Sequence, residues 1–523
     1  MPHAIQRKAP NATSVLAIDM NCMIYHVLRE PKMLAHKFPA ELGAVRVAWE
    51  RKLQDEVCSY LTHIWRAAGS PLQVYIALDG VVPYAKIKQQ RFRRFKSAAA
   101  GAGAWGLASP SPTNGAWGAN PTWDTNAITP GTEFMAAMGD ALRTAGSRFG
   151  WIISDTDEPG EGEHKVLRWL LTTPLKPGAI TVYGLDADLI LLCLLAGDKL
   201  GAEHPIFLMR EAMAFGKLVR LDNSNEVELC FFKVNTLRES LQRGKPWSRE
   251  QFYDYIFGMS FCGNDFLPTG LSLRIRDEGH AILLSCLDSL WKAGKHLVTF
   301  DEAGIARPSK EGLLAFAKWI QGQEDRLVLT TIKRKFSARL GESEEDNLPL
   351  VEQAEKPLVE GLDSESGPRL CRDWQVTYNR LALGDSSSEQ RKARVSDFWR
   401  GWCWILDYYQ GRTVDLEWVY PAGYPPTWRD LHDMCELPVQ DDWLCREPLK
   451  PKEQLALVLP LSSWGLLLKS EFRMLPTSMP QYWPRGFALE TLGKRFGWEC
   501  EPMIPMLSPA RLRHEVTRMN RAS

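Results

Sequence analysis

The sequence predicts an α/β fold: a mainly parallel sheet flanked by helices. Short apolar runs at residues 14–19, 73–79, 151–154 and 180–186 are typical of strands, and the first two read as buried ones. Longer stretches with helical spacing, such as 43–67 and 133–146, lie between these runs. Alternation of strands and helices favours a parallel sheet, in which ligand sites lie beyond the carboxyl ends of the strands.

The composition is that of a soluble globular protein with more than one domain. Of the 523 residues, 45% are apolar and 24% are charged, and 63 basic residues balance 63 acidic ones. Any basic site must therefore be local. The eleven cysteines form no CxxC pair, which favours a reducing compartment over a zinc site or a disulfide framework. The first ten residues lack a signal-peptide core, and the longest uncharged apolar stretch, 14 residues, is too short for a bilayer span.

Seven carboxylates occur in five short blocks, each at the edge of an apolar stretch. They are Asp19 in LAIDMN, Asp79 in VYIALDG, Glu161 and Glu163 in PGEGEHK, Asp186 and Asp188 in VYGLDADLILL, and Asp265 in FCGNDFLP. If they converge, their charges repel one another unless cations neutralise them. Hard oxygen ligands suit Mg²⁺ or Mn²⁺, so the blocks point to metal-assisted phosphoryl transfer.

Each block also has a simpler interpretation. Asp186 and Asp188 would face the same side of an extended segment and share a metal, but a helix cap next to a turn aspartate fits the same letters. Glu161 and Glu163, each flanked by glycine, fit either a close approach of the backbone or a solvated acidic turn. Aspartates that end strand-like runs fit Asx turns. Five acidic blocks, all at the edges of elements, favour a shared site over five independent caps.

A basic run, AKIKQQRFRRFK at residues 85–96, begins shortly after Asp79 and should therefore border the acids. On a helix, four of its residues fall at i, i+4, i+7 and i+8 and share one stripe: Lys86, Gln90, Arg93 and Arg94. An ammonium, an amide and two guanidiniums suit a phosphate that carries more than one negative charge. A solvated basic helix face, a nonspecific phosphate contact or a nuclear-localisation segment would have the same composition.

Several segments carry a family resemblance. In order they are LAIDMNCMIYH, LDGVVPYAKIKQQRFRRF, WDTNAITPGTEFM, DEPGEGEHKVL, VYGLDADLILL, HPIFLMRE and FCGNDFLP, with weaker matches at GWCWILDYYQG and EWVYPAGYPP. By these segments the chain resembles the XRN family of 5′→3′ exoribonucleases, closely over residues 14–275 and loosely over 370–431. The resemblance implies a PIN-like nuclease core, akin to flap endonucleases. It also implies Mg²⁺-dependent removal of 5′-nucleotides from single-stranded RNA that bears a 5′-monophosphate.

The resemblance implies a role for each candidate residue. The seven acids, Asp19 to Asp265, would bind the metal, with two Mg²⁺ ions expected and Mn²⁺ as an alternative. The stripe of Lys86, Gln90, Arg93 and Arg94 would form the 5′-phosphate pocket. Cys22 stands where the family usually has glycine, and Tyr25 replaces a stacking histidine, although tyrosine can still stack on a base. Leu416 and Trp418 stand where the family has two tryptophans, so we expect Trp418 to stack.

We expect the nuclease core to span residues 1–300, with a flexible insertion at 97–120, and a largely helical, tryptophan-rich part at 301–523 to pack on it. Residues 341–366 carry nine acids against one lysine and are expected to form a surface linker or loop. The chain is short for the family, so we expect it to lack the large C-terminal additions. We predict an intracellular protein, cytoplasmic rather than nuclear, that acts as a monomer away from membranes. The alternatives are a structure-specific 5′ DNA nuclease, a noncatalytic RNA-binding protein on a nuclease fold, and an interaction protein built on the tryptophan-rich part.

Overall fold

The computed structural model describes residues 5–10, 13–39, 43–101, 123–214, 217–221, 227–242, 244–337, 353–362, 367–384, 387–437 and 443–522. Most of the predicted insertion at 97–120 and much of the acidic segment 341–366 lie outside these residues. The chain divides into two compact units that interleave along the sequence. Unit 1 comprises Met1–Val82, Ala119–Pro246 and Pro448–Ala456, and unit 2 comprises Pro83–Gly118, Trp247–Glu447 and Leu457–Ser523. The two predicted parts, in contrast, were consecutive in the sequence.

Unit 1 is built on a seven-stranded sheet in the order β1-β9-β6-β5-β2-β3-β4. The strands are β1 (Ile5–Gln6), β2 (Thr13–Asp19), β3 (Gln73–Ala77), β4 (Ile152–Ser154), β5 (Ala179–Tyr183), β6 (Ile206–Glu211) and β9 (Leu229–Lys233). The five strands from β6 to β4 pair in parallel, whereas β9 is antiparallel to both of its neighbours. The predicted mainly parallel sheet is confirmed. β3 and β5 end two and three residues earlier than predicted, so Asp79 and Asp186 lie in the loops that follow.

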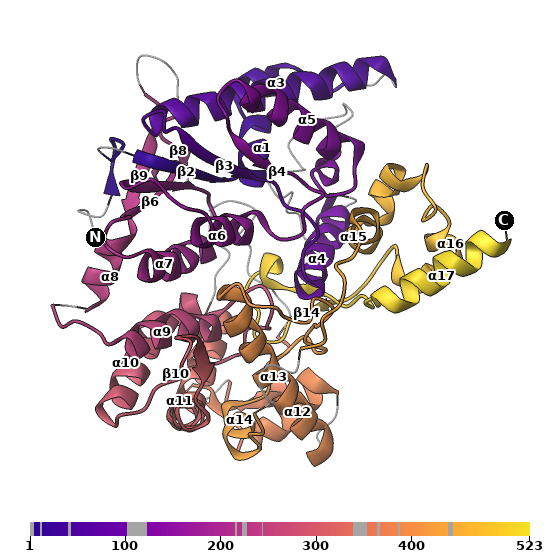
Figure 1. Ribbon diagram of the computed structural model, residues 1–523. Helices are drawn as coiled ribbons and strands as arrows, with labels where there is room; N and C mark the ends of the chain where they lie inside the picture. The colour runs from indigo at the N-terminus through magenta and orange to yellow at the C-terminus, as the bar shows by residue number, and fades with distance from the viewer. Residues whose placement is uncertain are drawn as a thin grey trace. The chain divides into compact units, whose positions relative to one another are not determined.

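Helices cover both faces of this sheet (Figure 1). One layer holds α1 (Asn21–Leu28), α3 (Ala44–Ala67) and α5 (Glu133–Ser147), and the other holds α6 (Gly162–Thr172) and α7 (Asp188–Leu200). Alternate side chains of β2 and β3, such as Ile18 and Ile76, pack under the first layer against Val57 of α3 and Leu142 of α5. The predicted helical stretches at 43–67 and 133–146 correspond to α3 and α5. Unit 1 also contains α2 (Pro31–Ala35), η2 (Thr125–Ala127), α8 (Val234–Gln242) and the hairpin β7 (Met213–Ala214) with β8 (Lys217–Leu218).

Unit 2 is largely helical, as predicted for the second part of the chain. Its α-helices are α4 (Tyr84–Gly101), α9 (Arg249–Gly258), α10 (Gly279–Lys292), α11 (Lys310–Phe336), α12 (Trp374–Leu383), α13 (Ser388–Tyr409), α14 (Trp428–Asp433), α16 (Leu475–Ser478) and α17 (Pro509–Ala522). Short 3-10 helices are η3 (Met259–Cys262), η4 (Ile275–Asp277), η6 (Lys356–Leu358), η7 (Leu461–Leu467), η8 (Pro480–Tyr482) and η9 (Gly497–Glu499). The hairpins are β10 (Val298–Phe300) with β11 (Ala306–Pro308), β12 (Val359–Glu360) with β13 (Arg369–Leu370), and β14 (Leu489–Glu490) with β15 (Glu501–Pro502). α15 (Pro451–Val458) crosses the boundary between the units.

Aromatic side chains fill the core of unit 2. Trp399, Trp402 and Trp404 of α13 are all buried, and the Phe261 ring stacks on that of Trp402 with centroids 5.5 Å apart. The tryptophan-rich block of the sequence is therefore mainly a packing device. Among the described residues, no helix combines the length and the apolar character needed to cross a membrane.

Part of the acidic segment 341–366 is not the surface loop that its composition predicts. Residues 356–360 form η6 and β12, and β12 pairs with β13. Glu355 is fully buried, and its Oε1 accepts hydrogen bonds from Lys335 Nζ, at 2.8 Å, and from the backbone N–H of Gly493. A buried carboxylate is tolerated when a cation and hydrogen bonds compensate it. The local density of acids cannot reveal a lysine partner that lies elsewhere in the chain.

Candidate metal centre

Six of the seven predicted acids lie at the carboxyl ends of the parallel strands of unit 1 or in the helices that follow them. Asp19 ends β2, Asp79 follows β3, Glu161 is the N-cap of α6, Glu163 lies in the first turn of α6, Asp186 is in the loop after β5, and Asp188 begins α7. The expectation that Asp186 and Asp188 share an extended segment is wrong. Because β5 ends at Tyr183, Asp186 lies in a loop, whereas Asp188 is the first residue of α7. A carboxylate is favourable at the N-terminus of a helix.

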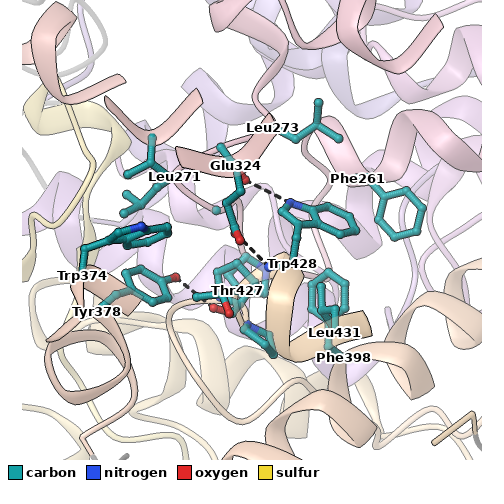
Figure 2. Close-up of a pocket in the computed structure, with 16 residues that line it drawn as sticks. Phe261, Leu271, Leu273, Glu324, Trp374, Tyr378, Phe398, Thr427, Trp428 and Leu431 are labelled. Atoms are coloured by element: carbon teal, nitrogen blue, oxygen red, sulfur yellow. Dashed lines mark hydrogen bonds between the residues drawn. The ribbon is translucent and has the colours of Figure 1, made fainter. Parts of the chain in front are cut away.

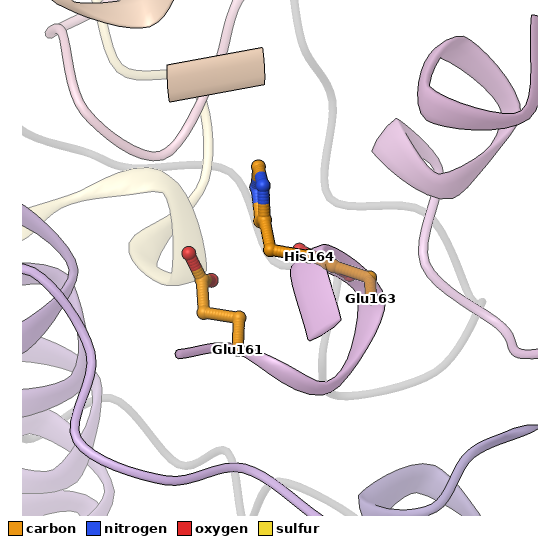
Figure 3. Close-up of side chains that lie close together, drawn as sticks. All are labelled: Glu161, Glu163 and His164. Carbon is orange, nitrogen blue, oxygen red and sulfur yellow. The ribbon is translucent and has the colours of Figure 1, made fainter. Parts of the chain in front are cut away.

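The side chains of three of these acids meet. Ligand oxygens of Asp19, Glu163 and Asp186 all lie within 4.8 Å of one another. A second group, Glu161, Glu163 and His164, also offers one ligand atom each within 4.8 Å, and Figure 3 shows Glu161 and His164 extending to the same side of the start of α6. Asp19, Glu161 and Glu163 are buried, whereas Asp186 is exposed, so the cluster is accessible from solvent at Asp186.

Asp79 is oriented by two hydrogen-bond donors. Asn21 Nδ2 donates to its Oδ2 at 2.8 Å, and the backbone N–H of Gly162 donates to its Oδ1 at 2.7 Å. Gly162 also lies against Asp19, since a Cβ atom at this position would come closer than 3.0 Å to Asp19 Oδ1. The two aspartates therefore flank Gly162, where the predicted close approach of backbone is confirmed, whereas Gly160 instead adopts a positive φ of 121°. Among the described residues, Asp79 and Asp188 belong to neither group of three ligands.

A buried lysine ties the loops of this site together. Lys165 of α6 is almost completely buried, and its Nζ donates to the backbone oxygens of Leu78, at 2.9 Å, and Asp155, at 2.6 Å. Leu78 directly precedes Asp79, so this ammonium links the end of β3 and the loop after β4 to the helix that carries Glu163. Burial lowers the pKa of Lys165 to about 8, although the charges of neighbouring acids, Asp79 among them, oppose the shift.

The acidic cluster affects the pKa of a nearby thiol, that of Cys22. Burial raises its pKa well above the ordinary value, and the nearby carboxylates of Asp19, Glu211 and Asp186 raise it further. Glu211 is itself buried, and its Oε1 accepts hydrogen bonds from Tyr60, at 2.8 Å, and Tyr183, at 2.6 Å. Burial and these carboxylates therefore both favour the neutral thiol at Cys22.

The chemistry of the donor set fits a hard divalent cation. Several carboxylates, three of them buried, lie close enough to share an ion, and their mutual repulsion is relieved when a cation binds between them. His164 adds one nitrogen donor. From the sequence, a structural or solvent-facing role for His164 was favoured over a functional one, although its spacing of three residues from Glu161 across the start of a helix was a signal for a shared site. The sequence analysis missed Asn21 and Lys165, whose partners lie on other elements.

The seventh acid, Asp265, belongs to unit 2, as does the basic stripe. The stripe lies on α4, as predicted: Gln90 and Arg94 are buried, Arg93 is exposed and Lys86 is partly buried. Asp265 Oδ2 accepts a hydrogen bond from Lys86 Nζ at 2.7 Å, so this carboxylate neutralises the lysine of the stripe.

The other three cations of the basic run are not a solvated face. Lys88 Nζ donates to the backbone oxygens of Tyr420 and Ala422, at 3.0 and 3.3 Å. Arg91 is almost fully buried, donates to Leu457 O at 2.6 Å and to Tyr482 O, and stacks on Phe95. Lys96 donates to two further carbonyls. One side of α4 is thus anchored to backbone oxygens, and the stripe occupies the other.

The two predicted stacking residues are both partly buried. Tyr25 of α1 packs against the core beneath the first helix layer of unit 1. Trp418 stacks on Trp404 with centroids 5.4 Å apart, and a Cβ on Gly401 would come closer than 3.0 Å to the Trp418 ring. Stacking of either ring on a base stays a prediction.

An aromatic cavity of about 30 Å³ lies within unit 2, with room for one or two water molecules (Figure 2). Glu324 of α11 points into it and accepts hydrogen bonds from the backbone N–H groups of Trp428, at 2.8 Å, and Arg429, at 3.4 Å. Burial raises the pKa of Glu324 to about 8, even though these hydrogen bonds lower it. Glu324 is therefore a pH-sensitive element of the core.

The mainly parallel sheet with carboxylates gathered at its strand ends defines an α/β protein with a candidate centre for divalent cations. Residues 2–212, which contain six of the acids and the basic stripe, match the family profile described as the N-terminus of XRN 5'-3' exonucleases. Residues 373–522 match the profile described as the Xrn1 helical domain. The chain belongs to the XRN family.

Curated relatives match over most of this chain. The Arabidopsis thaliana protein named 5'-3' exoribonuclease 2 is 27% identical and aligns with 84% of this chain and 57% of its own length. The Gallus gallus protein of the same name is 25% identical, over 89% of this chain and 62% of its own. The Homo sapiens protein named 5'-3' exoribonuclease 1 is 27% identical, over 88% of this chain and 30% of its own. The chain thus spans between about a third and two thirds of the length of these relatives.

Proposed function

We propose that this chain is a 5′→3′ exoribonuclease that hydrolyses single-stranded RNA with a 5′-monophosphate to 5′-mononucleotides. The observation that carries the proposal is the meeting of Asp19, Glu163 and Asp186 at the carboxyl end of the unit 1 sheet, with ligand oxygens within 4.8 Å of one another. Membership in the XRN family supports the same reaction, since the curated relatives are named 5'-3' exoribonucleases.

The proposed metal ligands are the seven acids: Asp19, Asp79, Glu161, Glu163, Asp186, Asp188 and Asp265. We propose Mg²⁺, as two ions, with Mn²⁺ as an alternative, because all seven donors are carboxylates. Bound at such a site, divalent ions lower the pKa of water and stabilise charge on the leaving 3′-oxygen. The chain contributes rigidity. Asn21 and Gly162 fix Asp79, and Lys165 fixes the backbone before it, so the carboxylates need little reorganisation as charge develops.

The stripe on α4, Lys86, Gln90, Arg93 and Arg94, is the proposed 5′-phosphate site. Two guanidiniums can each bind phosphate oxygens in pairs, which favours a terminal phosphate over a hydroxyl. To bind the phosphate, Lys86 must break its ion pair with Asp265, and the released Asp265 carboxylate could then bind metal. Tyr25 and Trp418 are proposed to stack on bases, since stacking on an aromatic ring is tolerant of sequence. A cap or triphosphate would be too bulky for a closed pocket.

The test compares RNAs of one sequence that carry a 5′-monophosphate, a 5′-triphosphate or a 5′-hydroxyl, with Mg²⁺ present. Release of mononucleotides is followed by thin-layer chromatography, beside a DNA 5′-flap substrate. We expect rapid release from the monophosphorylated RNA alone. Equal degradation of the three RNAs would contradict the phosphate site, preferential cleavage of the flap would favour a DNA nuclease, and no release with Mg²⁺ or Mn²⁺ would overturn the proposal.

Replacing both Asp186 and Asp188 by alanine tests the metal centre. We expect turnover to fall more than about a hundredfold, because even indirect changes around a metal cost roughly 10–100-fold. RNA binding in EDTA should persist, since the stripe lies on α4. The matched control is Glu203→Ala, which removes an exposed carboxylate of unit 1 outside the cluster. Normal turnover in the double variant would mean that the metal lies elsewhere.

A further inference from the structure

Trp498 stands apart from the other tryptophans. Its exposed fraction is 41%, whereas every other tryptophan among the described residues is buried or partly buried. The guanidinium carbon of Arg276, in η4, lies 3.9 Å from the centroid of the Trp498 ring. The Trp498 ring also stacks on Phe496, with centroids 6.0 Å apart and an interplanar angle of 14°, and Arg495 lies over Phe496 at 5.1 Å. Each of these four side chains contacts the next, and together they form a cluster in unit 2 that we call the Trp498 column.

The Trp498 column carries positive charge that acidic side chains do not neutralise. Among the described residues, neither Arg276 nor Arg495 has a carboxylate oxygen within 4.0 Å of its guanidinium. The nearby carboxylates are occupied by other arginines, in the ion pairs Asp277–Arg334 at 2.9 Å, Glu278–Arg334 at 3.0 Å and Glu499–Arg274 at 3.5 Å. An exposed aromatic ring under one guanidinium, beside a second ring that carries another, has the chemistry of a site for single-stranded nucleic acid.

The Trp498 column is attached to the helix that carries the proposed phosphate site. Lys96 of α4 donates to the backbone oxygens of Trp498, at 2.6 Å, and Cys500, at 2.7 Å. Lys96 follows Arg94 by two residues and lies about 15 Å along the helix from Lys86. Within unit 2, the column therefore lies near the C-terminal part of α4 and beyond the stripe.

We propose that the Trp498 column is a second binding site for single-stranded RNA, outside the metal acids and the 5′-phosphate stripe. A base stacks on the outer face of the Arg276 guanidinium and extends the column, while the edges of Arg276 and Arg495 contact backbone phosphates. The inference rests on the proposed function for the identity of the strand. The proposal implies that the Trp498 column binds RNA that extends past the 5′-phosphate site, and that this binding depends little on the base sequence.

The test measures binding of 3′-labelled RNA in EDTA, where metal-dependent cleavage stops, for a 4-nucleotide and a 24-nucleotide strand with 5′-monophosphates. Trp498→Leu removes the ring on which the Arg276 guanidinium lies, so the base loses its support. The Kd for the 24-mer should rise at least about fivefold, the lower end of what one stacked base contributes, and the Kd for the 4-mer should stay unchanged. Trp498→Phe keeps a ring and should stay within about twofold of wild type. Arg276→Gln should weaken binding of the 24-mer and reduce the slope of log Kd against log salt by about 1.

Arg380→Gln is the matched control, because it also replaces an exposed arginine of unit 2 by glutamine. Arg380 lies on α12 and is not one of the four residues of the Trp498 column. This variant should leave both Kd values unchanged. An unchanged Kd of Trp498→Leu for the 24-mer would overturn the proposal. Equal weakening for both lengths, with a lower Tm, would also overturn it, because Trp498 would then be a packing residue. Failure of the proposed function is seen separately, as wild-type protein that releases no mononucleotide from either RNA with Mg²⁺.

Discussion

Replacing Gly162 by alanine is expected to separate activity from stability. The added Cβ would come closer than 3.0 Å to Asp19 Oδ1 and to 3.2 Å from Ala77 O. The shorter contact is with the end of a side chain, so the Asp19 carboxylate must shift by about 1 Å, and a misplacement of that size costs roughly a hundredfold in rate. Overpacking costs about 1–3 kcal/mol, and Gly162 is the first residue of α6, where alanine gains little over glycine, so the free energy of unfolding should fall by about 1–3 kcal/mol.

The assay pairs the rate of mononucleotide release, at saturating Mg²⁺ and RNA, with thermal unfolding. Gly197→Ala is the control, because Gly197 lies within α7 of the same unit and its Cβ would approach no atom closer than 3.7 Å. The control should keep its activity and gain slightly in Tm. If Gly162→Ala turns over RNA within about threefold of wild type, then the position of the Asp19 carboxylate does not govern the reaction and the reasoning fails.

Three further outcomes follow from the contacts described. Asp265→Asn removes the charge that neutralises Lys86, so affinity for 5′-phosphorylated RNA in EDTA should rise while turnover with Mg²⁺ falls; a fall in both would contradict the proposed release of Asp265 from Lys86. The pKa of Glu324, raised from 4.5 to about 8 by burial, means that the folded state retains a proton between these values, so stability falls as the pH rises through this window. Glu324→Gln should abolish this fall, measured by urea unfolding at pH 5 and pH 8, whereas the exposed control Glu302→Gln should retain it. Added Mg²⁺ should raise the Tm of wild type but much less that of Asp19→Asn, since binding to the folded state alone is stabilising; equal rises would place the ion elsewhere.

Local pattern was sufficient to predict the sheet and the acids at its edge. Asp19 and Asp79 follow apolar runs of strand length, and the parallel order of such runs brings their carboxyl ends together. The close backbone approach at Gly162 could be predicted, because a glycine has no Cβ to collide with a neighbouring carboxylate. The place of Asp186 was less predictable, because a run that passes from strand to loop to helix within a few residues has no clear period.

Contacts between distant parts of the sequence could not be predicted. The basic run on α4 contains the proposed phosphate stripe and three anchoring cations, and the charged residues of both kinds are Lys or Arg in one short segment. What separates them is their partners: Arg91 donates to carbonyls of residues 457 and 482, which lie more than 360 positions later in the chain. Glu355 shows the same limit, since only the folded chain supplies Lys335 to a segment that reads as a solvated acidic loop.

The anchoring of α4 gives the C-terminal segment of unit 2 a role in the proposed phosphate site. A helix that holds a phosphate must not rotate, because a turn of one residue would move the stripe by about 100° around the axis. Lys88, Arg91 and Lys96 prevent this rotation by donating to backbone oxygens, which no substitution of side chains at those positions would remove. Arg91, buried and always charged, would be costly to leave without its carbonyl partners. If Arg93 and Arg94 bind a phosphate as proposed, their orientation depends on the carbonyl groups of residues 420–422 and 457–500, even though these residues contain none of the predicted catalytic acids.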